Sequence, residues 1–132
     1  MTSRPLAGLV LAAAMTLSGA AFAASHDNTI KMFDPDNDGT LDLSEVKNAA
    51  SALFDKLDPD KDGTLDAREL RGRLSKKELA AADPDHDGTL TKDEYLAVVE
   101  QRFNAANPDN DGTLDAKELK SHAGRALLRL MK

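Results

Sequence analysis

The sequence contains no cysteine and no tryptophan in 132 residues, and its aromatic content is 4%. Without cysteine, no disulfide can stabilise the fold. With so few aromatic residues the hydrophobic core is thin for a domain of this size, so part of the stability must come from another source. No nucleophile–base arrangement, glycine-rich phosphate loop or aromatic–basic patch occurs. We therefore expect neither an enzyme nor a nucleic-acid-binding protein.

Long apolar runs are also scarce, and the only one lies near the N-terminus. Arg4 precedes the apolar stretch from Leu6 to Leu17, and Ala21-Phe22-Ala23 has the form of a signal-peptidase site. The stretch is shorter than the ~20 residues of a membrane span, which disfavours the alternative of a transmembrane anchor. We predict a signal peptide at residues 1–23, cleaved near Ala23, and an exported, periplasmic domain at residues 24–132 without a membrane anchor.

In contrast to these absences, one twelve-residue pattern occurs four times, at residues 34–45, 58–69, 83–94 and 107–118. Each copy has oxygen-bearing side chains at loop positions 1, 3 and 5, glycine at 6, a backbone carbonyl donor at 7 and glutamate at 12. This is the ligand order of an EF-hand loop for a hard cation. One copy could arise by chance, but four in register predict four metal sites.

The candidate metal ligands occupy positions 1, 3, 5, 7, 9 and 12 of each loop. They are Asp34, Asp36, Asp38, Thr40, Asp42 and Glu45; Asp58, Asp60, Asp62, Thr64, Asp66 and Glu69; Asp83, Asp85, Asp87, Thr89, Thr91 and Glu94; and Asn107, Asp109, Asp111, Thr113, Asp115 and Glu118.

Most of the acidic residues lie in these loops. Removal of the signal peptide leaves 16 Lys+Arg against 23 Asp+Glu, a net charge of −7, and 18 of the 23 acids are candidate ligands. Unit charges ~4 Å apart repel by ~1 kcal/mol in water and ~4 kcal/mol at an effective dielectric of 20. A trivalent ion relieves that repulsion better than a divalent one. We expect the fourth loop to be the weakest site, because neutral Asn107 occupies position 1.

Proline follows position 1 in every loop, as Pro35, Pro59, Pro84 and Pro108. Its ring ends the incoming helix and restricts the backbone of the loop. The prolines therefore have one of two roles. They only end the incoming helices, or they also make the metal-binding loop more selective for the size of the ion.

Only 12 or 13 residues separate one loop from the next. Val46–Leu57 and Tyr95–Ala106 carry apolar residues at helical spacing, so each is expected to be one helix that leaves one loop and enters the next. Leu70–Ala82 contains Gly72 and the Ser75–Glu78 capping box, which predicts a short helix, a turn and a second short helix. That turn places loops 2 and 3 at one end of the molecule and loops 1 and 4 at the other. We expect the position-8 leucines to pair across facing loops, as 2 with 3 and 1 with 4. A C-terminal helix is predicted over Leu119–Met131, and Thr29–Phe33 is at most a short lead-in.

The position-2 proline, the short spacing, four loops in a small exported precursor and the asparagine that opens the last loop together resemble the lanmodulin family of lanthanide-binding EF-hand proteins from methylotrophic bacteria. The segments that carry the resemblance include residues 56–67 and 106–113. The resemblance implies an all-α, compact three-helix bundle that forms on binding lanthanide(III) ions of the La, Ce and Nd type, with Ca2+ as a weaker competitor. It also implies a periplasmic buffer or shuttle linked to a lanthanide-dependent methanol dehydrogenase or a lanthanide uptake system. Thr91 departs from the aspartate usual in the family.

A calcium-binding EF-hand protein, whose ion folds it for docking to a partner, is the alternative function. Dockerin-like loop–helix repeats act in this way. Charge and proline placement favour the trivalent ion, and the family resemblance carries much of the remaining weight.

Overall fold

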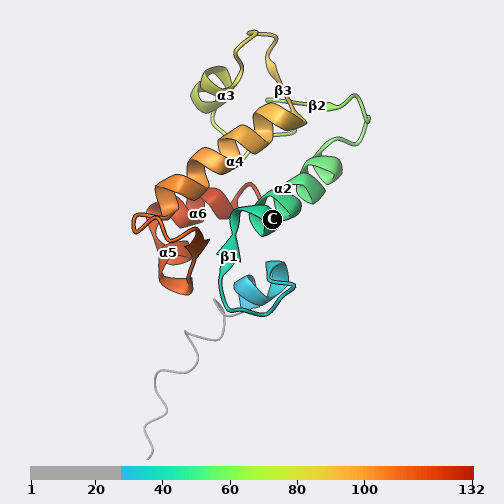
Figure 1. The fold of residues 1–132 in the computed structure, drawn as a ribbon. Helices are drawn as coiled ribbons and strands as arrows, with labels where there is room; N and C mark the ends of the chain where they lie inside the picture. The colour runs from blue at the N-terminus through green and yellow to red at the C-terminus, as the bar shows by residue number, and fades with distance from the viewer. Residues whose placement is uncertain (1–27) are drawn as a thin grey trace, which may run out of the picture.

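The computed structural model describes residues 28–132, so the predicted signal peptide lies outside the described residues. The element order is β1 (Leu41–Asp42), α2 (Leu43–Leu57), β2 (Thr64–Asp66), α3 (Lys76–Ala82), β3 (Thr89–Thr91), α4 (Lys92–Ala106), β4 (Thr113–Leu114), α5 (Ala116–Lys120) and α6 (His122–Leu128). Residues 28–33 are also helical, so the described chain is a helical protein with two small sheets (Figure 1). Within residues 28–132, no helix is both long enough and apolar enough to cross a membrane.

The two long helices, α2 and α4, each connect two loops as the sequence predicted. Each has 15 residues and begins at a capping box, which gives a length of ~22 Å. The apolar stripe of α2 buries Val46, Ala50 and Phe54. The Phe54 ring meets the ring of Tyr95 on α4 edge to face, with centroids 5.5 Å apart. The core between the helices therefore includes two of the few aromatic side chains.

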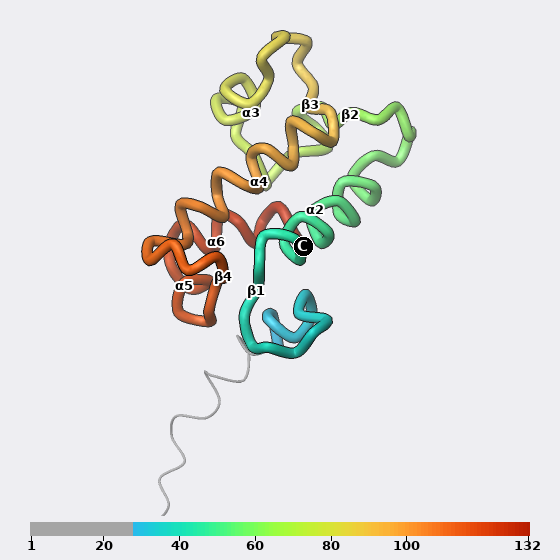
Figure 2. Tube along the Cα trace, in the orientation of Figure 1, coloured from blue at the N-terminus to red at the C-terminus, as the bar shows by residue number. Residues whose placement is uncertain are grey.

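Short antiparallel bridges join the loops in pairs. β1 pairs with β4 and β2 with β3, in a register that places Leu41 opposite Leu114 and Leu65 opposite Leu90. All four leucines are completely buried. The β2–β3 pair lies at one end of α2 and α4 and the β1–β4 pair at the other, as the trace in Figure 2 shows. This is the arrangement expected from the connector lengths.

Two connectors differ from the sequence prediction. The short helix predicted from Leu70 is a series of turns, and Gly72 has a φ of +81° there, a left-handed conformation that favours glycine. The helix after it, α3, begins at the Ser75–Glu78 capping box as predicted. The single helix predicted over residues 119–131 is instead divided at Ser121 into α5 and α6, because the Ser121 side chain bonds to nearby backbone groups in competition with a continuous helix.

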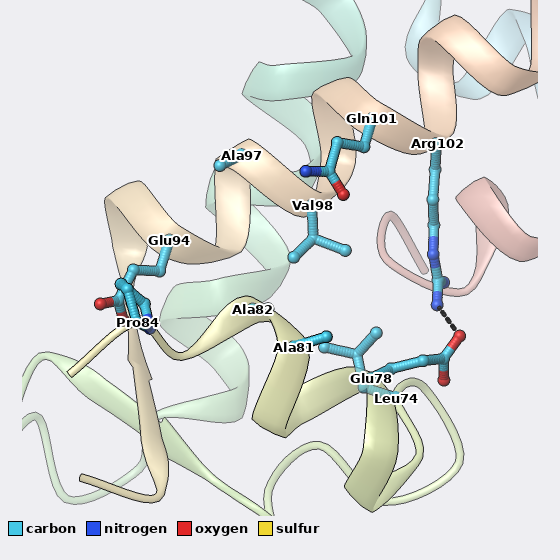
Figure 3. Close-up of a pocket in the computed structure, with 10 residues that line it drawn as sticks. All are labelled: Leu74, Glu78, Ala81, Ala82, Pro84, Glu94, Ala97, Val98, Gln101 and Arg102. Atoms are coloured by element: carbon cyan, nitrogen blue, oxygen red, sulfur yellow. Dashed lines mark hydrogen bonds and ion pairs between the residues drawn. The ribbon is translucent and has the colours of Figure 1, made fainter. Parts of the chain in front are cut away.

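Arg102 and Tyr95 on α4 tie the other helices to the core. Arg102 forms an ion pair of 2.9 Å with Glu78 of α3, at one end of a groove between α3 and α4 that is lined by Ala81 and Val98 (Figure 3). The Tyr95 hydroxyl donates to the carbonyl of Leu130 at 2.8 Å, inside the core. α4 is thereby in contact with both α3 and the C-terminal segment.

Candidate metal centres

The first loop gathers three carboxylates from distant loop positions. Asp34, Asp36 and Glu45 each offer an oxygen, and these oxygens all lie within 4.8 Å of one another. Glu45 is 8% exposed. Its Oε2 accepts a hydrogen bond from the Asp42 N–H at 2.8 Å, whereas its buried Oε1 has no hydrogen-bond partner among the described residues. An unpaired buried oxygen costs ~1–3 kcal/mol, so the presence of one on a carboxylate that lies beside two others fits a site for a cation.

The aspartate at position 1 holds each of the first three loops in its folded shape. In the first loop, Asp34 Oδ2 accepts from the Gly39 N–H at 2.9 Å and Oδ1 accepts from the Asp38 N–H at 3.3 Å. Asp58 and Asp83 accept the equivalent bonds in the second and third loops. Burial acts to raise the pKa of Asp34, but these hydrogen bonds outweigh it and the net pKa is lowered. The position-1 aspartates are therefore kept ionised and in place.

The pKa of the aspartate at position 3 is affected by the neighbouring aspartate at position 1. A hydrogen bond between the two carboxyl groups raises the pKa of Asp36, Asp60 and Asp85, because it favours their protonated form. At position 12, burial raises the pKa of Glu45 and Glu118, and repulsion from the loop aspartates adds to this effect. Such crowding of negative charge is what a bound cation would relieve.

The second and third loops repeat the three-carboxylate cluster, but the fourth does not. The equivalent clusters are Asp58, Asp60 and Glu69, and Asp83, Asp85 and Glu94. In the fourth loop Asn107 occupies position 1. With its amide oriented to suit its neighbours, it donates to Asp109 Oδ1 at 2.7 Å and accepts from the Gly112 N–H at 3.3 Å. Asn107 therefore keeps the bond to the loop glycine while supplying no charge.

The threonine at position 7 has a role that the sequence reasoning missed. The Thr40 hydroxyl and Thr40 N–H both donate to Asp38 Oδ1 at 2.8 Å, and the other three loops have the same pair of bonds. These bonds hold one oxygen of the position-5 aspartate, and the second oxygen takes no part in them. The recurrence of Thr two residues after Asp was the signal that could have indicated it.

The side chain at position 9 also caps the outgoing helix, a role that the sequence reasoning did not predict; its role as a ligand stays a prediction. Asp42 Oδ1 accepts from the Glu45 N–H at 2.8 Å, and Asp66 and Asp115 make the equivalent bond. In the third loop the Thr91 hydroxyl accepts from the Glu94 N–H at 3.3 Å. Thr91 thus fits the cap as aspartate does, although it brings no charge to the loop.

The backbone at position 4 is left-handed in every loop, which the sequence reasoning did not predict. The φ values lie between 53° and 58°, although none of these residues is glycine. A left-handed conformation of a residue with a Cβ costs ~1 kcal/mol or more. The residues are Asn37, Lys61, His86 and Asn110.

Comparison with known proteins adds two findings. The EF hand family matches residues 26–49, 51–71 and 76–99, which include the first three loops. The chain is also 59% identical over 76 residues to lanmodulin of Methylorubrum extorquens. That match covers 55% of this chain, and the chain spans about half the length of that relative, 56%. The resemblance expected from the loop pattern is therefore confirmed over this part of the chain.

Proposed function

We propose that this chain, which belongs to the EF-hand family, binds lanthanide(III) ions in its four loops and acts as a selective metal buffer or shuttle without enzymatic activity. Its EF-hand loops support metal binding in general. The observation that carries the proposal is the first loop, where oxygens from Asp34, Asp36 and Glu45 lie within 4.8 Å of one another and the Glu45 carboxylate has a buried oxygen without a hydrogen-bond partner among the described residues. A hard cation takes oxygen ligands of this kind.

The proposed ligands are those predicted at positions 1, 3, 5, 7, 9 and 12. The structure supports two ways of contributing. Positions 1, 3 and 12 bring carboxylate oxygens together directly, and position 5 is held by the threonine at position 7 with one oxygen free. Position 9 caps the helix, so we propose that its charge acts on the ion from outside the inner ring of ligands, where water often mediates in EF-hand loops.

Three features support a trivalent ion over calcium. Loops 1 and 2 each hold five carboxylates within twelve residues, and the pKa of Asp36, Asp60 and Asp85 is raised by a hydrogen bond to the neighbouring position-1 carboxyl group, with repulsion between the carboxylates adding to it. Neutralising such a site favours higher charge on the ion. The 59% identity to lanmodulin supports the same ion. We propose lanthanides of the La, Ce and Nd type as cargo and Ca2+ as a weaker competitor.

Metal binding is proposed to close the fold. α4 packs against both α2 and α6, and we propose that neutralised loops allow these helices to close as a compact three-helix bundle with loops 1 and 4, and 2 and 3, held together. The source of the free energy is the binding itself, because the cage exists only in the folded chain.

The site of action is proposed from the sequence. A leader at residues 1–23 with a cleavage site at Ala23 supports export to the periplasm, with residues 24–132 as the working domain. The resemblance to lanmodulin supports a link to lanthanide-dependent methanol oxidation or to lanthanide uptake.

Competitive titration of residues 24–132 with lanthanum and calcium, followed by circular dichroism, tests the proposal. We expect the metal-free protein to be loosely structured and to gain helix with about three or more equivalents of lanthanum, because repulsion must be neutralised before the thin core closes. Calcium should require a far higher concentration. Equal potency of the two ions would favour the calcium-dependent docking module instead, and a fully helical metal-free spectrum that lanthanum does not change would refute both.

A further inference from the structure

The helix that leaves the fourth loop differs from those that leave the first and third. α5 has 5 residues, whereas α2 and α4 have 15 each. It ends at Ser121, which is extended, with φ −62° and ψ 166°, and which also caps the start of α6. The chain therefore turns three residues after the position-12 glutamate, Glu118.

The backbone carbonyl of Glu118 accepts the hydrogen bonds that hold this turn. The Ser121 N–H donates to it at 3.1 Å and the Ser121 hydroxyl at 2.6 Å. The same hydroxyl accepts from the Gly124 N–H at 3.0 Å. On the other side, Glu118 is joined to Asp115 by the reciprocal capping bonds of 2.8 and 2.9 Å. Glu118 is thus held from the loop by Asp115 and from α6 by Ser121.

Gly124 packs directly against this backbone. A Cβ added at Gly124 would lie 2.6 Å from Leu119 Cα and closer still to the Glu118 carbonyl oxygen. Carbon atoms in contact lie ~3.5–4.0 Å apart, so a methyl group would force α5 and α6 apart by about 1 Å. The five other glycines among the described residues show no such contact. Space, and not backbone angle, requires glycine at this position.

We propose that Gly124, together with Ser121, is a positioning residue for the fourth metal site, because it determines where the Glu118 carboxylate lies. The inference rests on the proposed function. The fourth loop has no charge at position 1, and a bidentate glutamate must bring two oxygens to within ~2.3–2.6 Å of the ion. The fourth site therefore depends on the exact place of Glu118 more than the other sites depend on their glutamates.

The test is a lanthanum titration of the chain followed by NMR, with the amide of the position-6 glycine as a reporter for each site. The reporters are Gly39, Gly63, Gly88 and Gly112. For Gly124→Ala we expect at least tenfold weaker binding at Gly112 and less than twofold change at the other three reporters. Ser121→Ala should weaken the Gly112 response at least fivefold, by loss of both hydrogen bonds of the hydroxyl. Ser121→Thr keeps the hydroxyl and should bind as the wild type does.

The outcomes separate the inference from the proposed function. A wild-type chain that binds lanthanum at no reporter would refute the proposed function and this inference with it. Wild-type binding with an unchanged Gly112 response in both Gly124→Ala and Ser121→Ala would refute the inference alone. Equal weakening at all four reporters would also refute it, because it would mean a general effect on the fold. If Gly124→Ala does not fold, selective weakening in Ser121→Ala with rescue in Ser121→Thr supports the inference, and its absence refutes it.

Discussion

Replacing Glu45 by glutamine should stabilise the metal-free protein and weaken the first site. The oxygens of Asp34, Asp36 and Glu45 lie within 4.8 Å of one another, and unit charges at that distance repel by about 0.9 kcal/mol in water. Two of the three pairs involve Glu45, so Glu45→Gln relieves about 2 kcal/mol as a lower limit. The glutamine carbonyl can still accept the Asp42 N–H, and its amide replaces the buried Oε1 that has no partner among the described residues.

With metal bound, Glu45→Gln is expected to be unfavourable, because the substitution removes an attraction between the carboxylate and the ion. Each unit of charge on the ion interacts with a carboxylate oxygen ~2.5 Å away by ~1.7 kcal/mol in water, so the substitution removes about 5 kcal/mol from a trivalent ion and about 3.3 kcal/mol from a divalent one. Selectivity for lanthanum over calcium at the first site should therefore fall roughly fifteen- to twentyfold. The Gly39 amide reports on this site in NMR titrations with each ion.

The assay for the metal-free state is urea unfolding in excess chelator, followed by circular dichroism at 222 nm. Glu69→Gln is the matched control, since Glu69 makes the same capping bond but is only half-buried, and its effect should be smaller. A metal-free Glu45→Gln protein that is less helical or less stable than the wild type would refute the reasoning, because it would show that Glu45 does not carry uncompensated charge.

Three further predictions concern other loop and core positions. Asn107→Asp should strengthen lanthanum binding at the Gly112 reporter, and an unchanged affinity there would show that charge at position 1 does not limit the fourth site. Asp42→Asn should keep the helix cap and weaken binding of a trivalent ion more than binding of a divalent one. Asp42→Ala should weaken metal binding in the same way and also destabilise the metal-free helix by ~1 kcal/mol, because the cap is lost. Parallel titrations with both ions measure the first effect, and thermal melts of the metal-free variants measure the second. Burial raises the pKa of Tyr95 to about 12, so the unfolded chain ionises first, and stability that is complete below pH 10 should fall by up to ~2.7 kcal/mol as the pH rises toward 12. Tyr95→Phe should abolish that alkaline loss in urea titrations, and persistence of the loss would mean that another group causes it.

The two long helices and the loop order were predictable because both depend on neighbouring residues. Val46–Leu57 carries its apolar stripe at helical spacing, and Pro59 ends the helix one residue after its cap at Asp58. The pairing of loop 1 with loop 4 followed from the turn at Gly72, because the length of the connectors left few other arrangements.

The break in the C-terminal segment was not predictable in this way. Apolar residues at 119, 123, 126, 127 and 130 fit one helix, yet Ser121 interrupts it with bonds to Glu118 and Gly124. Serine can sit within a helix or cap one, and periodicity does not distinguish these cases. The position-9 caps were not predicted for a related reason, since aspartate serves equally as a ligand and as an N-cap.

By itself the sequence determined the loops, the kinds of oxygen ligand in them and the weaker charge of the fourth, because an EF-hand loop is twelve consecutive residues whose spacing is set by the local backbone. Only the tertiary structure decided that Glu45 is more buried than Glu69 and keeps an unpaired oxygen, and that α6 lies against the backbone of Glu118 where Gly124 leaves room for it. Burial and close approach depend on which distant segments pack together, and no local pattern of residues specifies that packing.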